Sequence, residues 1–131
     1  MARGVGLIIN KHLSWHIQSY KSFKGRIVYV DLNFKRNIKL RIIQIYNPPR
    51  HQKLLSEEIY YKLKEYIVEG QNKLFQVIVM GDFNEHMNEY YDRLTSGLSI
   101  QNSKFNFLRL MYKYNLLNMV EQFNSPPFAM T

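Results

Sequence analysis

The sequence predicts a single α/β domain in which a mixed β-sheet carries packed helices. Two apolar segments joined by a short polar turn predict an antiparallel hairpin, and the strand–helix alternation that follows predicts helices lying against the same sheet. A length of 131 residues suits one domain, and 46% hydrophobic with 21% charged residues is typical of a globular chain.

The hairpin is the clearest element. Residues 26–34 form the first strand, 35–37 the turn and 39–46 the return strand. Asn37 favours the turn because asparagine tolerates the left-handed conformation. Pro48 then ends the second strand, since proline cannot donate to a ladder. Four apolar side chains of the first strand share one face: Val28, Val30, Leu32 and Phe34.

A helix and a further strand follow the hairpin. Ser56 with two glutamates behind it predicts a helix start, and Gly70 a helix end. The continuous apolar run 75–80 predicts a central strand. A second helix is expected to begin at Ser103, with its apolar residues near one face.

The other segments are less regular. Residues 4–10 predict a short buried strand opened by glycines, and residues 11–24 a loop or a weak strand. The polar stretch 85–102 predicts a loop. Ser125 and the two prolines after it are expected to close the second helix.

Positive charge is concentrated in the first half of the chain. Residues 1–55 hold eleven Lys and Arg against one acidic residue, Asp31, for a net +10. Residues 56–131 hold seven basic and nine acidic residues, for a net −2. This asymmetry indicates either a polyanionic partner for the first half or a set of solvated strand faces.

The composition also limits location and redox chemistry. Cysteine is absent, so neither disulfides nor thiolate metal sites are expected. The apolar run near the N-terminus is too short for the core of a signal peptide, and no segment approaches the ~20 apolar residues needed to cross a bilayer. The prediction is an intracellular protein without a membrane partner, with the nucleus as one option.

The segment 77–84 is the strongest candidate for chemistry. An apolar strand leads into Gly81, where the backbone bends or is approached closely, and then into Asp82, Phe83 and Asn84. In an extended chain the side chains at 82 and 84 point to the same side. A carboxylate that orients water or a cation, beside an amide that stabilises an oxyanion, suits phosphoryl transfer. On spacing alone, a strand-ending turn explains the same residues.

The pattern apolar strand–Gly-Asp-Phe-Asn resembles the signature of the endonuclease/exonuclease/phosphatase superfamily, which includes DNase I-like nucleases. Residues 43–49, with Tyr46-Asn47-Pro48-Pro49, are similar to the Tyr-x-Pro segment of that family. Residues 92–93, 115–120 and 125–131 are similar to tracts in the nuclease domains of non-LTR retrotransposons. The resemblance covers nearly the whole chain and implies a DNase I-like layered sandwich, with mixed, largely antiparallel sheets and flanking helices.

The resemblance implies roles for three residues. Asp82 would orient or deprotonate the attacking water, Asn84 would bind phosphate oxygens, and Tyr46 would hydrogen-bond the phosphate or order the nucleophile. It also implies Mg²⁺, with Mn²⁺ as a substitute, held at an incomplete site by Asp82. Pro49 stands where the family often has an asparagine, which removes one expected phosphate contact.

Two family segments are not found in the sequence: an Asn and a metal-binding Glu upstream, and a Ser-Asp-His downstream. Residues 1–131 are therefore expected to be a partial domain, truncated at both ends, with doubtful hydrolytic activity. The alternative is a catalytically inactive remnant, or a partial gene model, that binds nucleic acid non-specifically. Surface or loop roles are expected for the four histidines.

The basic first half supplies candidate substrate contacts. Nucleic acid is the expected partner, DNA rather than RNA, although a phospholipid headgroup and the oligomeric state stay open. Contacts to backbone phosphates would be tolerant of sequence and sensitive to salt. The candidates lie on or around the hairpin: Arg26, Lys35, Arg36, Lys39 and Arg41.

Overall fold

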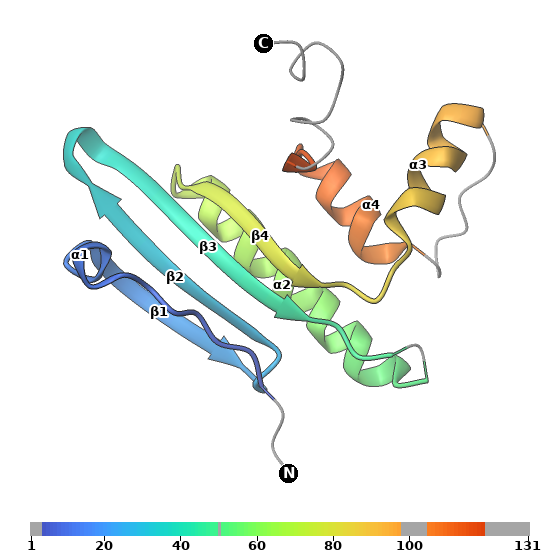
Figure 1. Cartoon of the computed structure of the whole chain (residues 1–131), viewed down its shortest axis with the longest axis horizontal. Helices are drawn as coiled ribbons and strands as arrows, with labels where there is room; N and C mark the ends of the chain where they lie inside the picture. Colours follow the sequence, from blue (N-terminus) through green and yellow to red (C-terminus); the bar gives the residue numbers. More distant parts are fainter. Residues whose placement is uncertain (1–3, 50, 98–104, 120–131) are drawn as a thin grey trace.

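A computed structural model describes residues 4–49, 51–97 and 105–119. The described chain forms a four-stranded mixed sheet in the order β1-β2-β3-β4, with one long helix lying against a face of the sheet (Figure 1). Neighbouring strands are antiparallel except for β3 and β4, which run parallel. The α/β class is confirmed by this arrangement. The strands are β1 (Ile17–Phe23), β2 (Ile27–Phe34), β3 (Ile38–Tyr46) and β4 (Gln76–Asp82).

The predicted hairpin is confirmed as β2 and β3. Their register pairs Ile27 with Ile45 at one end and Phe34 with Ile38 at the other. The turn is a short 3₁₀ segment, η1 (Lys35–Asn37), in which Arg36 and Asn37 have positive φ angles of 64° and 61°. Asparagine adopts this conformation readily, whereas arginine does so less often.

Helix α2 (Lys53–Asn72) covers one face of the sheet (Figure 1). It starts one turn before the predicted Ser56 and ends two residues after the predicted Gly70. Gly70 is buried where the helix crosses the sheet, and a β-carbon there would lie 3.1 Å from side-chain atoms of Arg41 and Val77. Glycine at this position therefore allows the helix to pack closely against the sheet, and it does not end the helix.

The first residues of the chain differ from the prediction. Residues 4–10 do not form a strand, and the side chain of Ile8 is fully exposed. Residues 11–24 contain a short helix that was not predicted, α1 (Lys11–Ser14), and then strand β1, which confirms the strand alternative for this segment. A backbone bond from Val5 N to Gly25 O (2.9 Å) attaches residues 4–10 to the turn between β1 and β2, and one from Asn33 N to His16 O (2.9 Å) attaches the residue before β1 to β2.

Two further helices follow β4. The predicted loop at 85–102 is wrong for its first half, which forms α3 (Met87–Ser96). The last described helix, α4 (Asn106–Lys113), confirms a helix in this part of the chain. The expected helix start at Ser103 lies outside the described residues. The prediction that this helix continues to Ser125 is wrong, because α4 ends at Lys113 and residues 114–118 are not helical.

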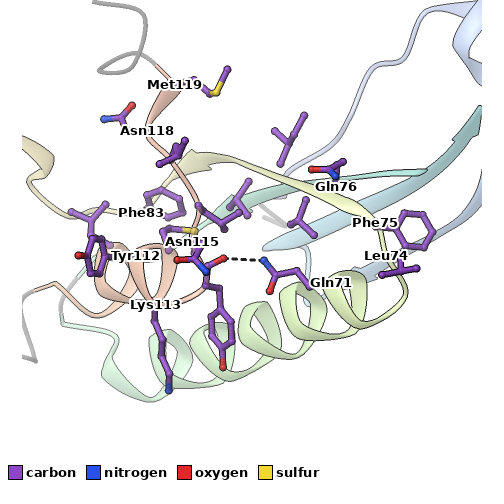
Figure 2. Close-up of a pocket in the computed structure, with 18 residues that line it drawn as sticks. Gln71, Leu74, Phe75, Gln76, Phe83, Tyr112, Lys113, Asn115, Asn118 and Met119 are labelled. Carbon is purple, nitrogen blue, oxygen red and sulfur yellow. Dashed lines mark hydrogen bonds between the residues drawn. The ribbon is translucent and has the colours of Figure 1, made fainter. Parts of the chain in front are cut away.

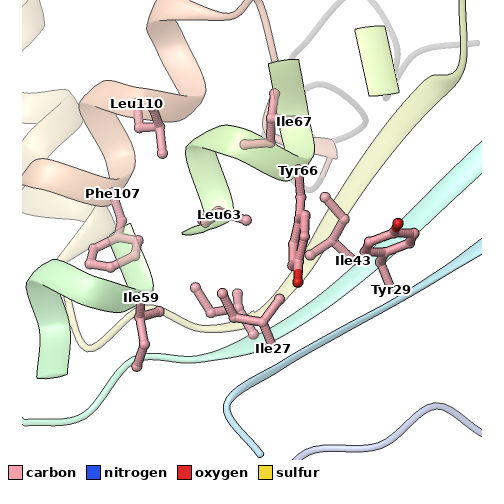
Figure 3. Close-up of a cluster of buried hydrophobic side chains, with 10 residues drawn as sticks. Ile27, Tyr29, Ile43, Ile59, Leu63, Tyr66, Ile67, Phe107 and Leu110 are labelled. Carbon is pink, nitrogen blue, oxygen red and sulfur yellow. The ribbon is translucent and has the colours of Figure 1, made fainter. Parts of the chain in front are cut away.

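The main core lies between the sheet and α2 (Figure 3). Its centre joins side chains of β2, β3 and α2, and α4 closes one end with Phe107 and Leu110. Tyr29 and Tyr66 meet edge to face, with ring centroids 4.7 Å apart. Burial raises the pKa of both phenols. Fully buried members of the sheet–helix interface are Ile27, Ile43, Ile45, Ile59, Leu63 and Ile67.

Strand β4 is an edge strand in the described sheet, not the central strand that its apolar sequence suggested. Val77 and Val79 pack toward the core, but Ile78 and Met80 remain 41% and 42% exposed on the other face. A continuous apolar run predicts two apolar faces, and here only one of them is covered by the described residues.

Candidate functional site

The candidate residues meet where two parallel strands end. Tyr46, the last residue of β3, is the register partner of Asp82, the last residue of β4. Adjacent strands lie about 4.8 Å apart, so the two side chains leave neighbouring backbone positions. In α/β sheets the carboxyl ends of parallel strands are the usual location of ligand sites. The fold therefore places these two candidate residues next to each other.

Gly81 allows the strands to end in this way. Its φ angle is +129°, and a β-carbon would overlap the carbonyl oxygen of Ile45 on the neighbouring strand. Only glycine adopts this conformation and this separation without strain. Gly81 therefore sets the distance between the ends of β3 and β4.

After Asp82 the chain turns instead of continuing as a strand. Asn84 has a φ angle of 52°, and its backbone N–H donates to Asp82 Oδ1 at 2.8 Å. The Asn84 side chain donates from Nδ2 to the carbonyl oxygen of Asn47. The expectation that an extended backbone places residues 82 and 84 on one side is therefore wrong. The aspartate and the amide belong to a tight turn, and both residues remain exposed.

Asn47 holds the two strand ends together. Its backbone N–H donates to Asp82 O at 2.8 Å, and its Nδ2 donates to Phe83 O at 2.8 Å. Its Oδ1 accepts a 2.9 Å bond from the Ser56 hydroxyl on α2. Asn47 is 5% exposed, so these bonds satisfy a buried amide. Sequence reasoning missed this residue, although an asparagine between a strand-ending tyrosine and a proline was a usable signal.

Arg26 is the cation that the fold brings to this site. Its guanidinium carbon lies 5.0 Å from the centre of the Tyr46 ring, and its backbone oxygen accepts from Tyr46 N at 2.8 Å. The ring face attracts the cation and holds it beside the phenol. Arg26, Tyr46 and Asp82 thus combine two hydrogen-bond donors with one carboxylate.

Glu85 links the site to the helical layer. Its carboxylate accepts from the backbone N–H groups of Phe107 (3.0 Å) and Leu108 (2.9 Å), in the first turn of α4. A negative side chain is stabilising at that end of a helix. Glu85 therefore serves α4 and does not add a second carboxylate beside Asp82.

The hairpin cations are not gathered at one place. Lys35 and Arg36 lie in η1, at the end of β3 opposite to Tyr46. Lys39 is near that end as well, with its Nζ 5.6 Å from the Phe75 ring centre. Of the five residues predicted to contact phosphate, only Arg26 lies beside the ends of β3 and β4.

The prediction that Arg41 contacts substrate is wrong. This side chain is 1% exposed and donates to both carboxylate oxygens of Asp31, at 2.7 and 2.8 Å. It also donates to Tyr66 O at 2.9 Å and to Glu69 at 3.2 Å on α2. Burial alone would lower the pKa of Arg41, but the hydrogen bonds and charge of Asp31 raise it above its ordinary value.

The described residues offer a metal ion little beyond Asp82. They contain no group of three or more His, Asp or Glu side chains arranged to hold one. Mg²⁺ is often held by one or two protein carboxylates together with substrate phosphates. Asp82 supplies one such carboxylate, which is enough only when a phosphate ligand supplies further oxygens.

An open groove runs along the helix side of β4 (Figure 2). It measures about 950 Å³ and lies between Val77 and Val79 of β4 and residues 111–119. A bond of 2.9 Å from Gln71 Nε2 to Tyr114 O joins its walls. Its lining includes Lys113 but neither an acidic residue nor a histidine, and Phe83 is the one residue of the segment 81–84 that lines it.

Fold and site together define an α/β protein with a polar, partly cationic site at the carboxyl ends of two parallel strands. No protein-family model, no curated protein and no solved structure matches this chain. Among the described residues, no helix is long and apolar enough to cross a membrane.

Proposed function

We propose that the chain binds nucleic acid through a backbone phosphate at the ends of β3 and β4, as the phosphate-binding part of a phosphodiesterase site. The observation that supports this is the convergence of Arg26, Tyr46 and Asp82 at neighbouring strand ends. The resemblance of Gly-Asp-Phe-Asn and Tyr-Asn-Pro-Pro to the endonuclease/exonuclease/phosphatase signature supports the same function, with DNA as the preferred substrate.

Each residue has a definite part in the proposed site. The Arg26 guanidinium and the Tyr46 hydroxyl donate to phosphate oxygens. An amide carries two N–H donors, and Asn84 uses one on Asn47, which leaves the other for the phosphate. The Asp82 carboxylate accepts a proton from a water molecule on the far side of the phosphorus and orients it for in-line attack.

Asp82 would also be the residue that holds Mg²⁺, once a phosphate supplies further oxygen ligands. The ion would neutralise charge on the phosphate. The described residues contain no group of three or more ligating side chains that could hold a metal ion, and this favours a second candidate function, which is phosphate binding without hydrolysis. In that case the chain binds nucleic acid and does not turn it over.

Plasmid nicking with Mg²⁺ separates the two candidates. Asp82→Asn is the informative variant because it removes the charge and keeps an oxygen that can accept from Asn84 N. Asp92→Asn, on α3, is the matched control for loss of one exposed carboxylate. Hydrolysis predicts nicking by the wild type and by Asp92→Asn, and none by Asp82→Asn.

Binding is measured separately, by fluorescence anisotropy with labelled duplex DNA. Both candidates predict weaker binding for Arg26→Ala than for the wild type. Nicking that persists in Asp82→Asn would contradict the catalytic role, and equal binding by Arg26→Ala would contradict the site itself.

A further inference from the structure

We propose that the hairpin turn is a second contact for the nucleic-acid backbone, and that the substrate is a duplex long enough to reach both ends of the hairpin. This inference rests on the proposed function at the strand ends and extends it to the length of the substrate. It is carried by the positions, charges and surroundings of Lys35 and Arg36.

The first half of the chain presents almost only positive charge to solvent. Its single acidic residue, Asp31, is 4% exposed and is neutralised by Arg41. No carboxylate within residues 1–55 therefore reaches the surface to offset the eight other basic side chains that the structure describes there. Such a one-signed surface attracts a polyanion over distances of about a Debye length, ~8 to 10 Å in moderate salt.

The turn cations are available, in contrast to other basic residues of the chain. Lys24 is paired with Glu58, and Lys73 with Glu69 at 3.3 Å. Lys35 and Arg36 are exposed, and neither forms an ion pair with a carboxylate of the described chain. Their charge is therefore left for an external partner.

Aromatic side chains accompany these cations. Trp15, at the end of α1, is 82% exposed, and the next residue, His16, lies 4.7 Å from the Phe34 ring, centre to centre. His16 O accepts from Asn33 N, so the end of α1 is fixed beside the end of β2 (Figure 1). An exposed aromatic ring therefore lies in the same part of the surface as the turn.

The length of the hairpin sets the length of the ligand. β3 contains nine residues from Ile38 to Tyr46, which is eight steps of about 3.4 Å, or roughly 27 Å. Duplex DNA advances about 3.4 Å per base pair, so roughly eight base pairs match this distance. A shorter duplex contacts the strand-end site or the turn, but not both.

The experiment compares two labelled duplexes, of six and sixteen base pairs, by anisotropy over a range of salt concentrations. The double variant Lys35→Ser/Arg36→Asn removes both turn charges, and asparagine tolerates the positive φ at position 36. Lys64→Ala/Lys113→Ala removes two charges from the helical layer and is the matched control. Arg26→Ala reports on the strand-end site.

We expect the turn variant to weaken binding of the sixteen-mer about tenfold or more, and to flatten its log–log salt dependence by about 1.8, at 0.9 per phosphate contact. Binding of the six-mer should change at least threefold less. The readout is the ratio of variant to wild type at each length, because a longer duplex offers more overlapping positions. The control pair should leave both ratios near one.

Three results would overturn this inference. Equal variant-to-wild-type ratios for the two duplex lengths would contradict the length requirement. A ratio near one for the sixteen-mer would contradict the turn contact. If Arg26→Ala still weakens binding in those cases, the proposed strand-end site stands without the second contact. Absence of binding by either duplex would overturn both proposals.

Discussion

Removing Asp31 should destabilise the fold strongly, because the guanidinium of Arg41 would stay buried without its carboxylate. Arg41 is 1% exposed and its side chain remains protonated in proteins. Breaking a buried ion pair by removing one partner typically costs about 3–5 kcal/mol. Glu69 is a weaker substitute, since it reaches only one guanidinium nitrogen, at 3.2 Å. We therefore expect Asp31→Ala to lower the free energy of unfolding by about 3 kcal/mol or more.

Urea unfolding followed by circular dichroism measures this change, and a double variant isolates its cause. In Asp31→Leu/Arg41→Met both charges are replaced by apolar side chains, and such replacements are often neutral or stabilising. The double variant should therefore recover at least half of the loss. A loss below about 1 kcal/mol for Asp31→Ala, or a double variant less stable than the single one, would refute the reasoning.

Three further predictions concern the strand ends and the ion-pair network. Gly81→Ala should lose about 2 kcal/mol or more of unfolding free energy, and should weaken DNA binding, because its β-carbon overlaps Ile45 O; unchanged urea midpoint and affinity would contradict this. Asn47→Ala should cost about 1–3 kcal/mol, more than Ser56→Ala, because it leaves Phe83 O unpaired; equal losses in urea unfolding would contradict this. Burial alone would raise the pKa of Glu69, but hydrogen bonds from Arg41 and Lys73 lower it below the ordinary value of 4.5. The contribution of Glu69 to the free energy of unfolding is therefore complete above that ordinary value and is lost as the pH falls below it. Urea unfolding between pH 5 and 3 should show a smaller loss for Glu69→Gln than for the wild type, and an identical pH dependence would contradict the assignment.

The backbone of the central elements was predictable because each has a single strong signal. Alternating apolar residues around a polar turn identify β2 and β3, and helical spacing identifies α2. Helix α3 was missed because its sequence is mostly polar, and polarity was taken for a loop. Residues 4–10 were misassigned because an apolar run bordered by glycine resembles a strand whether or not a partner strand is present.

The candidate site was half predictable for a similar reason. Two strand-ending motifs identified Tyr46 and Asp82 as candidate residues, but no sequence signal predicted that β3 and β4 are parallel neighbours, which is what brings the two residues together. The conformation of Asn84 could not be deduced from a spacing of two, because a turn at that residue redirects its side chain. The burial of Arg41 was accessible in principle: a hairpin centred on residue 36 places Asp31 opposite Arg41.

The Glu85 carboxylate affects how this protein can be dissected. It stands three residues beyond Asp82 and holds the first turn of α4 through two backbone N–H groups. Excising the segment that contains α4 would leave this carboxylate without those donors, beside the loop that presents Asp82. A shortened chain ending after α3 would therefore be a poor substitute for the full chain in binding studies, even though every residue of the strand-end site would be retained.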